Sequence, residues 1–409
     1  MITTTTQETV MIPDAVLEIA AAHQPDWSAP EELAAVRNEL HGRPPLVDAH
    51  SCHALAGELE FVARGEAVVI QAGDCAELFS DSARHRVQAK ASQLHHLCET
   101  AESAGVPTVR IGRFAGQFAK PRSCATEVLP DGTEIPVYRG DAVNGLNPTA
   151  EARRADPARL LTAYDLTATG LDALFMRQLL LSEGGSGISS MLAPTYISHE
   201  ALLLDFEHAL LRQDKARGGN YASSAHMVWI GERTRQLDHA HLAFAERITN
   251  PVGVKIGPNA TPEELIAIVD RLATGHGRGR LSLIVRMGAE KIADRLPALV
   301  TALGTRAGQV TWLSDPMHGN TKKTTAGQKT RVVTDIEAEV GDFCRILREH
   351  RVHPGGLHLE VSPDPVTECV DTTAELTGAL RLDRYESACD PRLNPDQAQR
   401  VVRHFTKLL

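Results

Sequence analysis

Eight short apolar runs recur along the chain, and segments with helical patterns separate most of them. The runs lie at 67–71, 106–111, 194–198, 227–231, 252–256, 281–286, 310–314 and 357–361. Helical patterns cover 84–102, 199–213, 261–272, 289–303 and 332–349. Short buried strands that alternate with helices predict a parallel sheet, and eight of them predict a closed (β/α)8 TIM barrel. The alternative is an open, doubly wound α/β sheet.

The clearest predicted helix spans 261–272. Thr261 can cap its N-terminus, Pro262 suits the first helical position, and Glu264 completes a capping box. Residues 1–60 predict an N-terminal helical extension, with a helix opening at 30–37 and ending at Arg43-Pro44-Pro45, before a catalytic barrel over 61–409. The strand at 194–198 is the weakest of the eight, and the long segment 140–193 is expected to hold extra helices.

Composition and charge narrow the function classes. Of the 409 residues, 43% are hydrophobic, which excludes disorder for most of the chain. The net charge of −10 argues against a nucleic-acid partner, so an anionic ligand needs a local basic pocket. Seven scattered cysteines without a CxxC motif argue against a disulfide scaffold or a zinc ribbon. Neither a secretory signal nor an apolar run of membrane-spanning length is visible, so a cytoplasmic enzyme without a membrane partner is expected.

Polar residues gather where the predicted strands end. Examples are the segment 73–77 after the first strand, 231–235 after the fourth and 315–320 after the seventh. In a barrel these ends converge on one catalytic face, whatever their separation in sequence.

Two sets of side chains are expected to meet there. The first is cationic and suits phosphate and carboxylate groups, so that two phosphate-bearing ligands would explain its size: Arg113, Lys120, Arg122, Arg233, Arg235, Lys255 and Arg286. The alternative is that each pairs with a structural carboxylate or lies on the surface.

The second set is Cys75, His318, Glu360 and Asp390. A thiolate, an imidazole and two carboxylates can hold a divalent metal, and this mixture fits Mn, Fe, Co or Zn better than Ca or Mg. The alternative is a core cysteine, a helix-capping histidine and a turn aspartate.

At these residues the sequence resembles the type II, plant-like 3-deoxy-D-arabino-heptulosonate 7-phosphate (DAHP) synthases, in a short form without regulatory extensions. The matching stretches lie at 73–77, 113–123, 138–141, 229–236, 253–258, 286–288, 314–321 and 389–394. The resemblance implies a TIM barrel and a transferase of the shikimate pathway that condenses phosphoenolpyruvate with erythrose 4-phosphate.

The resemblance also implies a role for each matching residue. The metal, Mn²⁺ or Co²⁺, would be held by Cys75, His318, Glu360 and Asp390. Phosphoenolpyruvate would be held by Arg113, Glu232, Arg233, Lys255 and Arg286, and erythrose 4-phosphate would face Lys120, Arg122 and Ser123. Lys120, His318 and Glu232 would be catalytic. Lys120 would protonate or hydrogen-bond the developing alkoxide, and Glu232 would orient water or Arg233.

The sequence departs from longer members of the family. It starts late, and residues 181–193 are short and rich in Gly and Ser, so feedback inhibition by aromatic amino acids is not expected. Such short forms resemble those that feed secondary metabolism. Two alternatives stay open: an aminoDAHP synthase that uses an amino or imino analogue of the sugar phosphate, and a catalytically silent sugar-phosphate-binding paralogue. The family implies a homo-oligomer, and it includes members that associate with a chorismate mutase, for which this sequence gives no support.

Overall fold

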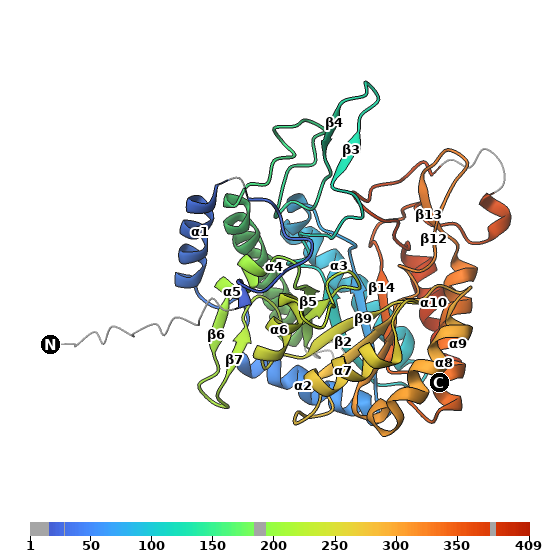
Figure 1. Cartoon of the computed structure of the whole chain (residues 1–409). Coiled ribbons are helices and arrows are strands. Elements are labelled where there is room, and N and C mark those ends of the chain that lie inside the picture. Colours follow the sequence, from blue (N-terminus) through green and yellow to red (C-terminus); the bar gives the residue numbers. More distant parts are fainter. Residues whose placement is uncertain (1–15, 28, 184–193, 377–381) are drawn as a thin grey trace.

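The computed structural model, which describes residues 16–27, 29–183, 194–376 and 382–409, has a closed parallel barrel at its centre (Figure 1). The eight strands are β1 Val68–Gly73, β2 Thr108–Arg113, β5 Thr195–Glu200, β8 Met227–Ile230, β9 Val252–Ile256, β10 Leu281–Val285, β11 Thr311–Ser314 and β14 Gly356–Glu360. They close in the order β1-β14-β11-β10-β9-β8-β5-β2. The predicted (β/α)8 barrel is therefore confirmed, and the open sheet is excluded.

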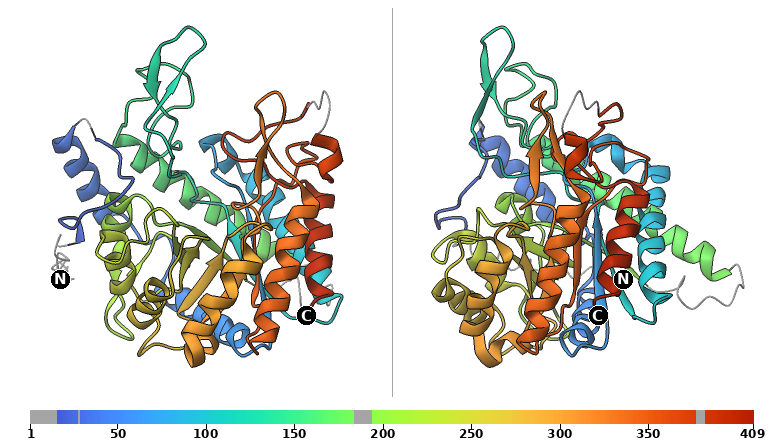
Figure 2. Two further views of the ribbon diagram at one scale, coloured as in Figure 1. Left: turned by 45° about the vertical axis from the view of Figure 1, so that its right-hand side comes forward. Right: turned by 90° about the vertical axis from the view of Figure 1, so that its right-hand side faces the viewer.

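Helices surround the barrel (Figure 2). They are α1 Pro30–Gly42, α2 Ala49–Ala63, α3 Arg84–Glu102, α4 Ala158–Glu183, α5 Leu204–Ala209, α6 Ala240–Arg247, α7 Pro262–Leu272, α8 Ile292–Leu303, α9 Val333–Glu349 and α10 Pro395–Thr406. The capping box predicted for 261–272 is present in α7, because Thr261 accepts from the Glu264 N–H and Glu264 accepts from the Thr261 N–H. Among the described residues, no helix is long and apolar enough to cross a membrane.

Alternate strand residues face two separate cores. In β1, Val68 and Ile70 pack outward against the helices, whereas Val69 packs inside the barrel. Helix α2 closes the lower end of that interior with Leu55 and Leu59 (Figure 1). Residues 49–63 thus form one helix across the division expected at residue 60, and that division stays a prediction.

Three short hairpins extend the loops between barrel elements. They are β3 Thr126–Val128 with β4 Glu134–Pro136, β6 Leu211–Gln213 with β7 Asn220–Ala222, and β12 Thr321–Lys323 with β13 Lys329–Arg331. The hairpins β3-β4 and β12-β13 rise above the end of the barrel at which the strands finish (Figure 1). That end is the face on which the sequence predicts the site.

One predicted helix is largely wrong. Residues 199–213 continue β5 to Glu200, form only the short α5, and then enter β6. The Glu200 N–H donates to the Gln117 side chain at 2.8 Å and the Ala201 N–H donates to the Trp229 carbonyl at 2.9 Å. These bonds to neighbouring segments extend the strand where the local pattern favoured a helix. Within the described residues 140–183 there is one long helix, α4, whereas residues 184–193 of the segment expected to hold extra helices lie outside the described part of the chain.

Candidate active site

A cavity of about 270 Å³ opens where the barrel strands end. It gathers residues from most of the strand ends, and its lining includes Cys75, Arg113, Lys120, Glu200, Trp229, Glu232, Arg233, Lys255, Arg286, His318, Lys329 and Asp390. Both sets predicted from the sequence therefore contribute to one cavity. This position is the catalytic face of (β/α)8 barrels.

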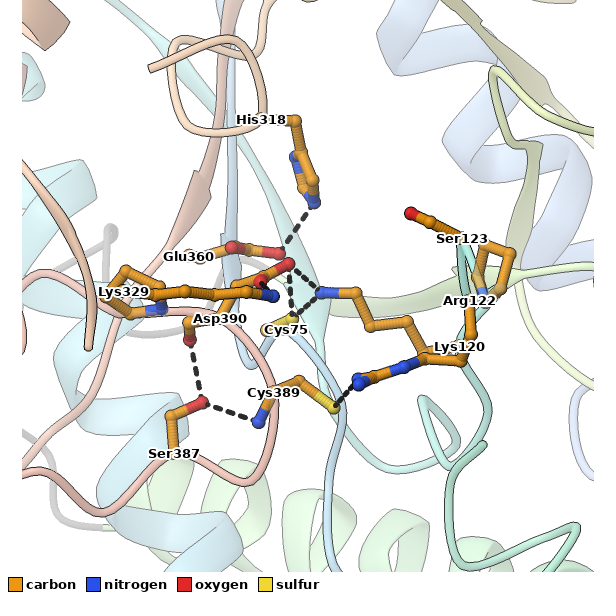
Figure 3. A network of polar contacts seen from close by, with 12 residues as sticks. Cys75, Lys120, Arg122, Ser123, His318, Lys329, Glu360, Ser387, Cys389 and Asp390 are labelled. Carbon is orange, nitrogen blue, oxygen red and sulfur yellow. Dashed lines mark hydrogen bonds and ion pairs between the residues drawn. The ribbon is translucent and has the colours of Figure 1, made fainter. Parts of the chain in front are cut away.

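Three side chains that could bind a metal ion lie close together at this cavity (Figure 3). One potential ligand atom from each of Cys75, Glu360 and Asp390 lies within 4.8 Å of the others. The His318 Nε2 atom lies 3.0 Å from Glu360 Oε1. The Lys120 Nζ atom reaches between Cys75 and Asp390 and contacts both.

The carboxylates of this group favour a cation next to them. Burial acts to raise the pKa of the Asp390 carboxyl, but Lys120, Arg331 and His318 together outweigh burial, and the pKa is lowered. Burial likewise disfavours the charged form of Lys120, but Cys75 and Asp390 raise its pKa well above the usual value. Burial raises the pKa of the Cys75 thiol, helped by its contact with Cys389.

The donor set fits a divalent metal ion. It combines sulfur, nitrogen and carboxylate oxygen, a mixture that suits Mn, Fe, Co or Zn. The ammonium of Lys120 already lies against two of the donors, which shows that their surroundings favour positive charge. Arg331 adds a further buried cation, 2.8 Å from Glu360 Oε2.

Asp315 fixes the orientation of His318. Its carboxylate lies 2.8 Å from His318 Nδ1, and the same carboxylate accepts from Lys255 Nζ at 2.8 Å. The opposite ring nitrogen, Nε2, is thereby directed at Glu360. This arrangement is typical of histidines that bind metals, because a partner on one ring nitrogen fixes the tautomer of the other.

One wall of the cavity, which we call the cationic wall, contains Arg113, Lys255 and Arg286. Arg113 and Lys255 lie over the Trp229 ring, at 5.2 and 5.8 Å from its centroid. Arg286 donates to the His318 carbonyl at 2.6 Å. Buried guanidinium nitrogens of Arg113 and Arg286 lack hydrogen-bond partners in the described structure. Arg113 also pairs with Glu360 at 3.2 Å, so the nitrogens without partners belong to a partly paired guanidinium. An anionic ligand would accept from these nitrogens, since buried polar atoms without hydrogen bonds are costly.

Two loops of this wall approach each other without side chains between them. Gly288 has a φ of +86°, and a Cβ added to Gly319 would lie 2.1 Å from the Gly288 nitrogen. Any larger residue at 319 would push these loops apart. Glycine at both positions therefore allows the Arg286 segment to contact the segment that carries His318.

The structure separates the two arginines that follow Glu232. Arg235 pairs with Glu232 at 3.0 Å and with Glu264 at 3.3 Å and is not among the residues that line the cavity, which is the alternative left open for each cation. Glu232 thus pairs with Arg235, and it also accepts from the Gly257 N–H at 2.6 Å. Arg233 instead donates to Ser123 Oγ at 2.9 Å.

The expected sugar-phosphate residues are divided between two pockets. Lys120 lines the cavity, whereas Arg122 and Ser123 line a neighbouring pocket of about 690 Å³. The Arg122 guanidinium lies 3.9 Å from the Cys389 sulfur.

Sequence reasoning missed several residues of the cavity. Glu200 ends β5 inside it, and burial raises the pKa of its carboxyl. Its place at the end of the third strand was a usable signal, but the predicted helix at 199–213 concealed it. Lys329, which donates to Asp390 at 2.7 Å, comes from β13, a three-residue strand with no sequence signal.

Comparisons with known proteins find relatives over most of the chain. The model of the class-II DAHP synthetase family matches residues 11–188 and 175–405. A phospho-2-dehydro-3-deoxyheptonate aldolase from Streptomyces coelicolor is 42% identical over 93% of both chains. A probable enzyme of the same name from Pseudomonas fluorescens is 42% identical over 95% of both chains. The aldolase AroG from Mycolicibacterium smegmatis is 38% identical over 97% of this chain and 94% of that protein.

A solved phospho-2-dehydro-3-deoxyheptonate aldolase from Francisella tularensis aligns with a TM-score of 0.56 over 91% of this chain and 95% of its own. At 14% identity, that likeness shows the fold alone. The sequence relatives and the family model together confirm the resemblance and the enzyme class that it implied. The chain belongs to the class-II DAHP synthetase family.

Proposed function

We propose that this protein condenses phosphoenolpyruvate with erythrose 4-phosphate to give DAHP and inorganic phosphate. The observation that carries the proposal is one cavity in which an acidic thiol–imidazole–carboxylate cluster faces a cationic wall. The family membership of the chain and the names of its relatives support the same reaction.

The metal, Mn²⁺ or Co²⁺, would be held by Cys75, His318, Glu360 and Asp390. When bound, such an ion supplies Lewis-acid polarisation of the aldehyde carbonyl. Asp315 keeps His318 in the required orientation, because it binds the ring nitrogen that faces away from the cluster.

The cationic wall would bind phosphoenolpyruvate. Arg113, Lys255 and Arg286 supply charge for its carboxylate and phosphate, and Arg233 borders the same cavity. Glu232 acts through Arg235 and the Gly257 N–H to hold this side of the pocket. Holding both reactants in one cavity lowers the activation barrier, because their translational and rotational entropy is lost on binding and not in the reaction step.

Lys120 would hold the reacting oxygen of the sugar phosphate. Carbon 3 of phosphoenolpyruvate forms a bond to the aldehyde carbon, whose oxygen takes up a proton. The ammonium of Lys120, which lies next to Cys75 and Asp390, is the group placed to donate it. Water adds at carbon 2, and the phosphate then departs. Arg122 and Ser123 would meet the far phosphate of the sugar from the neighbouring pocket.

The test is turnover of the two substrates by purified protein, followed through the loss of phosphoenolpyruvate absorbance. We expect turnover to disappear after thorough chelation and to return with Mn²⁺ or Co²⁺. Turnover that survives chelation would overturn the metal role. Turnover only with an amino or imino analogue would favour the aminoDAHP reaction, and binding without turnover would favour the silent paralogue. A role in secondary metabolism and a homo-oligomeric state stay predictions.

A further inference from the structure

Next to the cluster of Cys75, Glu360 and Asp390 lies a second group of charged side chains that the proposed chemistry does not use. Asp74, Glu77, Lys90, Glu368 and Arg392 are all buried. Lys90 Nζ lies 2.6 Å from Asp74 and 2.8 Å from Glu77. Arg392 lies 2.7 Å from the other oxygen of Asp74 and 2.9 Å from Glu368. The five side chains therefore form one continuous network, which we call the buried charge network.

The network joins the two chain segments that supply Cys75 and Asp390. Asp74 immediately precedes Cys75 at the end of β1, and Arg392 follows Asp390 by two residues. The Asp74–Arg392 ion pair is thus a direct bridge between segments 318 positions apart. It fixes the spacing of two donors that no local structure holds together.

At each end of the network, a carboxylate also accepts hydrogen bonds from a loop of the site. Glu368 accepts from the Glu386 N–H at 3.0 Å and the Ser387 N–H at 2.8 Å, and the Ser387 hydroxyl donates to the Asp390 carbonyl at 2.7 Å. Figure 3 shows Ser387 between the backbones of Cys389 and Asp390.

At the other end, the second oxygen of Glu77 accepts from the Gly116 and Gln117 N–H groups at 3.0 and 3.1 Å. That loop leads directly to Lys120, so the network also reaches the segment that carries the site's ammonium.

Stability alone is a poor explanation for such a group. Buried ion pairs cost desolvation energy that their attraction barely repays, and apolar replacements are often as stable. Two of the three carboxylates, Glu77 and Glu368, also accept from backbone N–H groups of two site loops, which suggests a geometric role instead. Outer partners of metal ligands set ligand orientation in this way.

We propose that the buried charge network is a positioning device that holds Cys75, Asp390 and the Lys120 loop at the spacing that metal binding requires. The inference rests on the metal role proposed above. It assigns no contact with substrate or metal to these five residues. Their effect is transmitted through the main chain on either side of the ligands.

The test is the affinity of chelated protein for Co²⁺, measured with the thiolate-to-cobalt absorption band as a report on Cys75. Arg392→Lys keeps the positive charge but cannot bridge Asp74 and Glu368 with a planar fork. We expect its Co²⁺ affinity to fall about 10- to 100-fold, with a displaced or weakened band. Arg280→Lys is the matched control, because Arg280 is a buried arginine at the opposite end of the barrel that donates to backbone carbonyls. It should lower the melting temperature without changing Co²⁺ affinity.

Glu368→Gln is the second variant, which removes the charge but keeps an oxygen for the Ser387 N–H. It should also weaken Co²⁺ binding about 10- to 100-fold, and it provides the test if Arg392→Lys does not fold. Wild-type affinity and an unchanged band in folded Arg392→Lys or Glu368→Gln would overturn the positioning role, whatever their melting temperatures. Absence of the thiolate band in the wild-type protein would instead overturn the metal role on which the inference rests.

Discussion

Glu339 gives the sharpest test of how this site is supported. It is fully buried in α9, and one carboxylate oxygen accepts from the Met287 and Gly288 N–H groups, each at 2.8 Å. The other oxygen accepts from Asn320 Nδ2 at 2.7 Å. One side chain thus holds both the loop that follows Arg286 and the loop that follows His318. Burial, which outweighs these three hydrogen bonds, raises the pKa of Glu339 to about 7.

The sign of the pH dependence follows from that shift. A carboxyl with a pKa near 7 in the folded state, against an ordinary 4.5, favours folding in its protonated form. Its contribution is complete below the unfolded pKa and is lost as the pH rises through 7. Between pH 5 and pH 8 the loss amounts to about 2 to 3 kcal/mol, at 1.36 kcal/mol per pKa unit.

The perturbation is Glu339→Gln, which cannot ionise. Urea unfolding of the wild-type protein and the variant at pH 5 and pH 8 would be compared, so that every other titrating group cancels. We expect the wild-type protein to lose about 2 to 3 kcal/mol more than the variant over this interval. Parallel pH profiles within about 0.5 kcal/mol would refute the reasoning, because they would mean that the hydrogen bonds keep the pKa near its usual value.

Three further outcomes are expected. Chelated protein given Co²⁺ at about a hundred times its Kd should gain about 2.7 kcal/mol in unfolding experiments, and Cys75→Ser should lose most of that gain; an equal gain in both would remove Cys75 from the ligand set. Lys255→Met should weaken phosphoenolpyruvate binding at least about tenfold by calorimetry, since a cavity cation is lost, and unchanged binding would exclude Lys255 from the wall. Thr261→Ala should cost about 1 kcal/mol of stability through the cap of α7 and leave turnover unchanged; reduced turnover would contradict a purely local effect.

The barrel was predictable because its strands are buried on both faces and therefore appear as continuous apolar runs. The helix ends that were predicted best have chemical markers, such as Thr261 with Glu264, or Arg43 before Pro44 at the end of α1. The failure at 199–213 came from hydrogen bonds to Gln117 and Trp229, which lie far away in sequence. Local patterns contain no information about such partners.

The candidate site was predictable to the extent that strand ends determine it. Cys75, Lys255 and Glu360 follow from strand positions, whereas Asp390 lies on no predicted strand and entered the metal set for its carboxylate. Pairing was not predictable: Arg235 and Arg233 are two residues apart and equally basic, yet of these two only Arg235 pairs with carboxylates in the described structure. Lys329 was missed because hairpin strands of three residues carry too short a pattern to detect.

The seam of the barrel joins the beginning of the sheet to its end. Gly73 in β1 is paired with Glu360 in β14, and every other strand is made between them. At ribosomal speeds of about 5 to 20 residues per second, roughly 15 to 60 s separate the synthesis of these two neighbours. A nascent chain therefore carries Cys75 for most of its translation without the partners that complete the cluster. Loading of the proposed metal site would therefore be an event of the finished polypeptide, governed by the metal supply that it meets after leaving the ribosome.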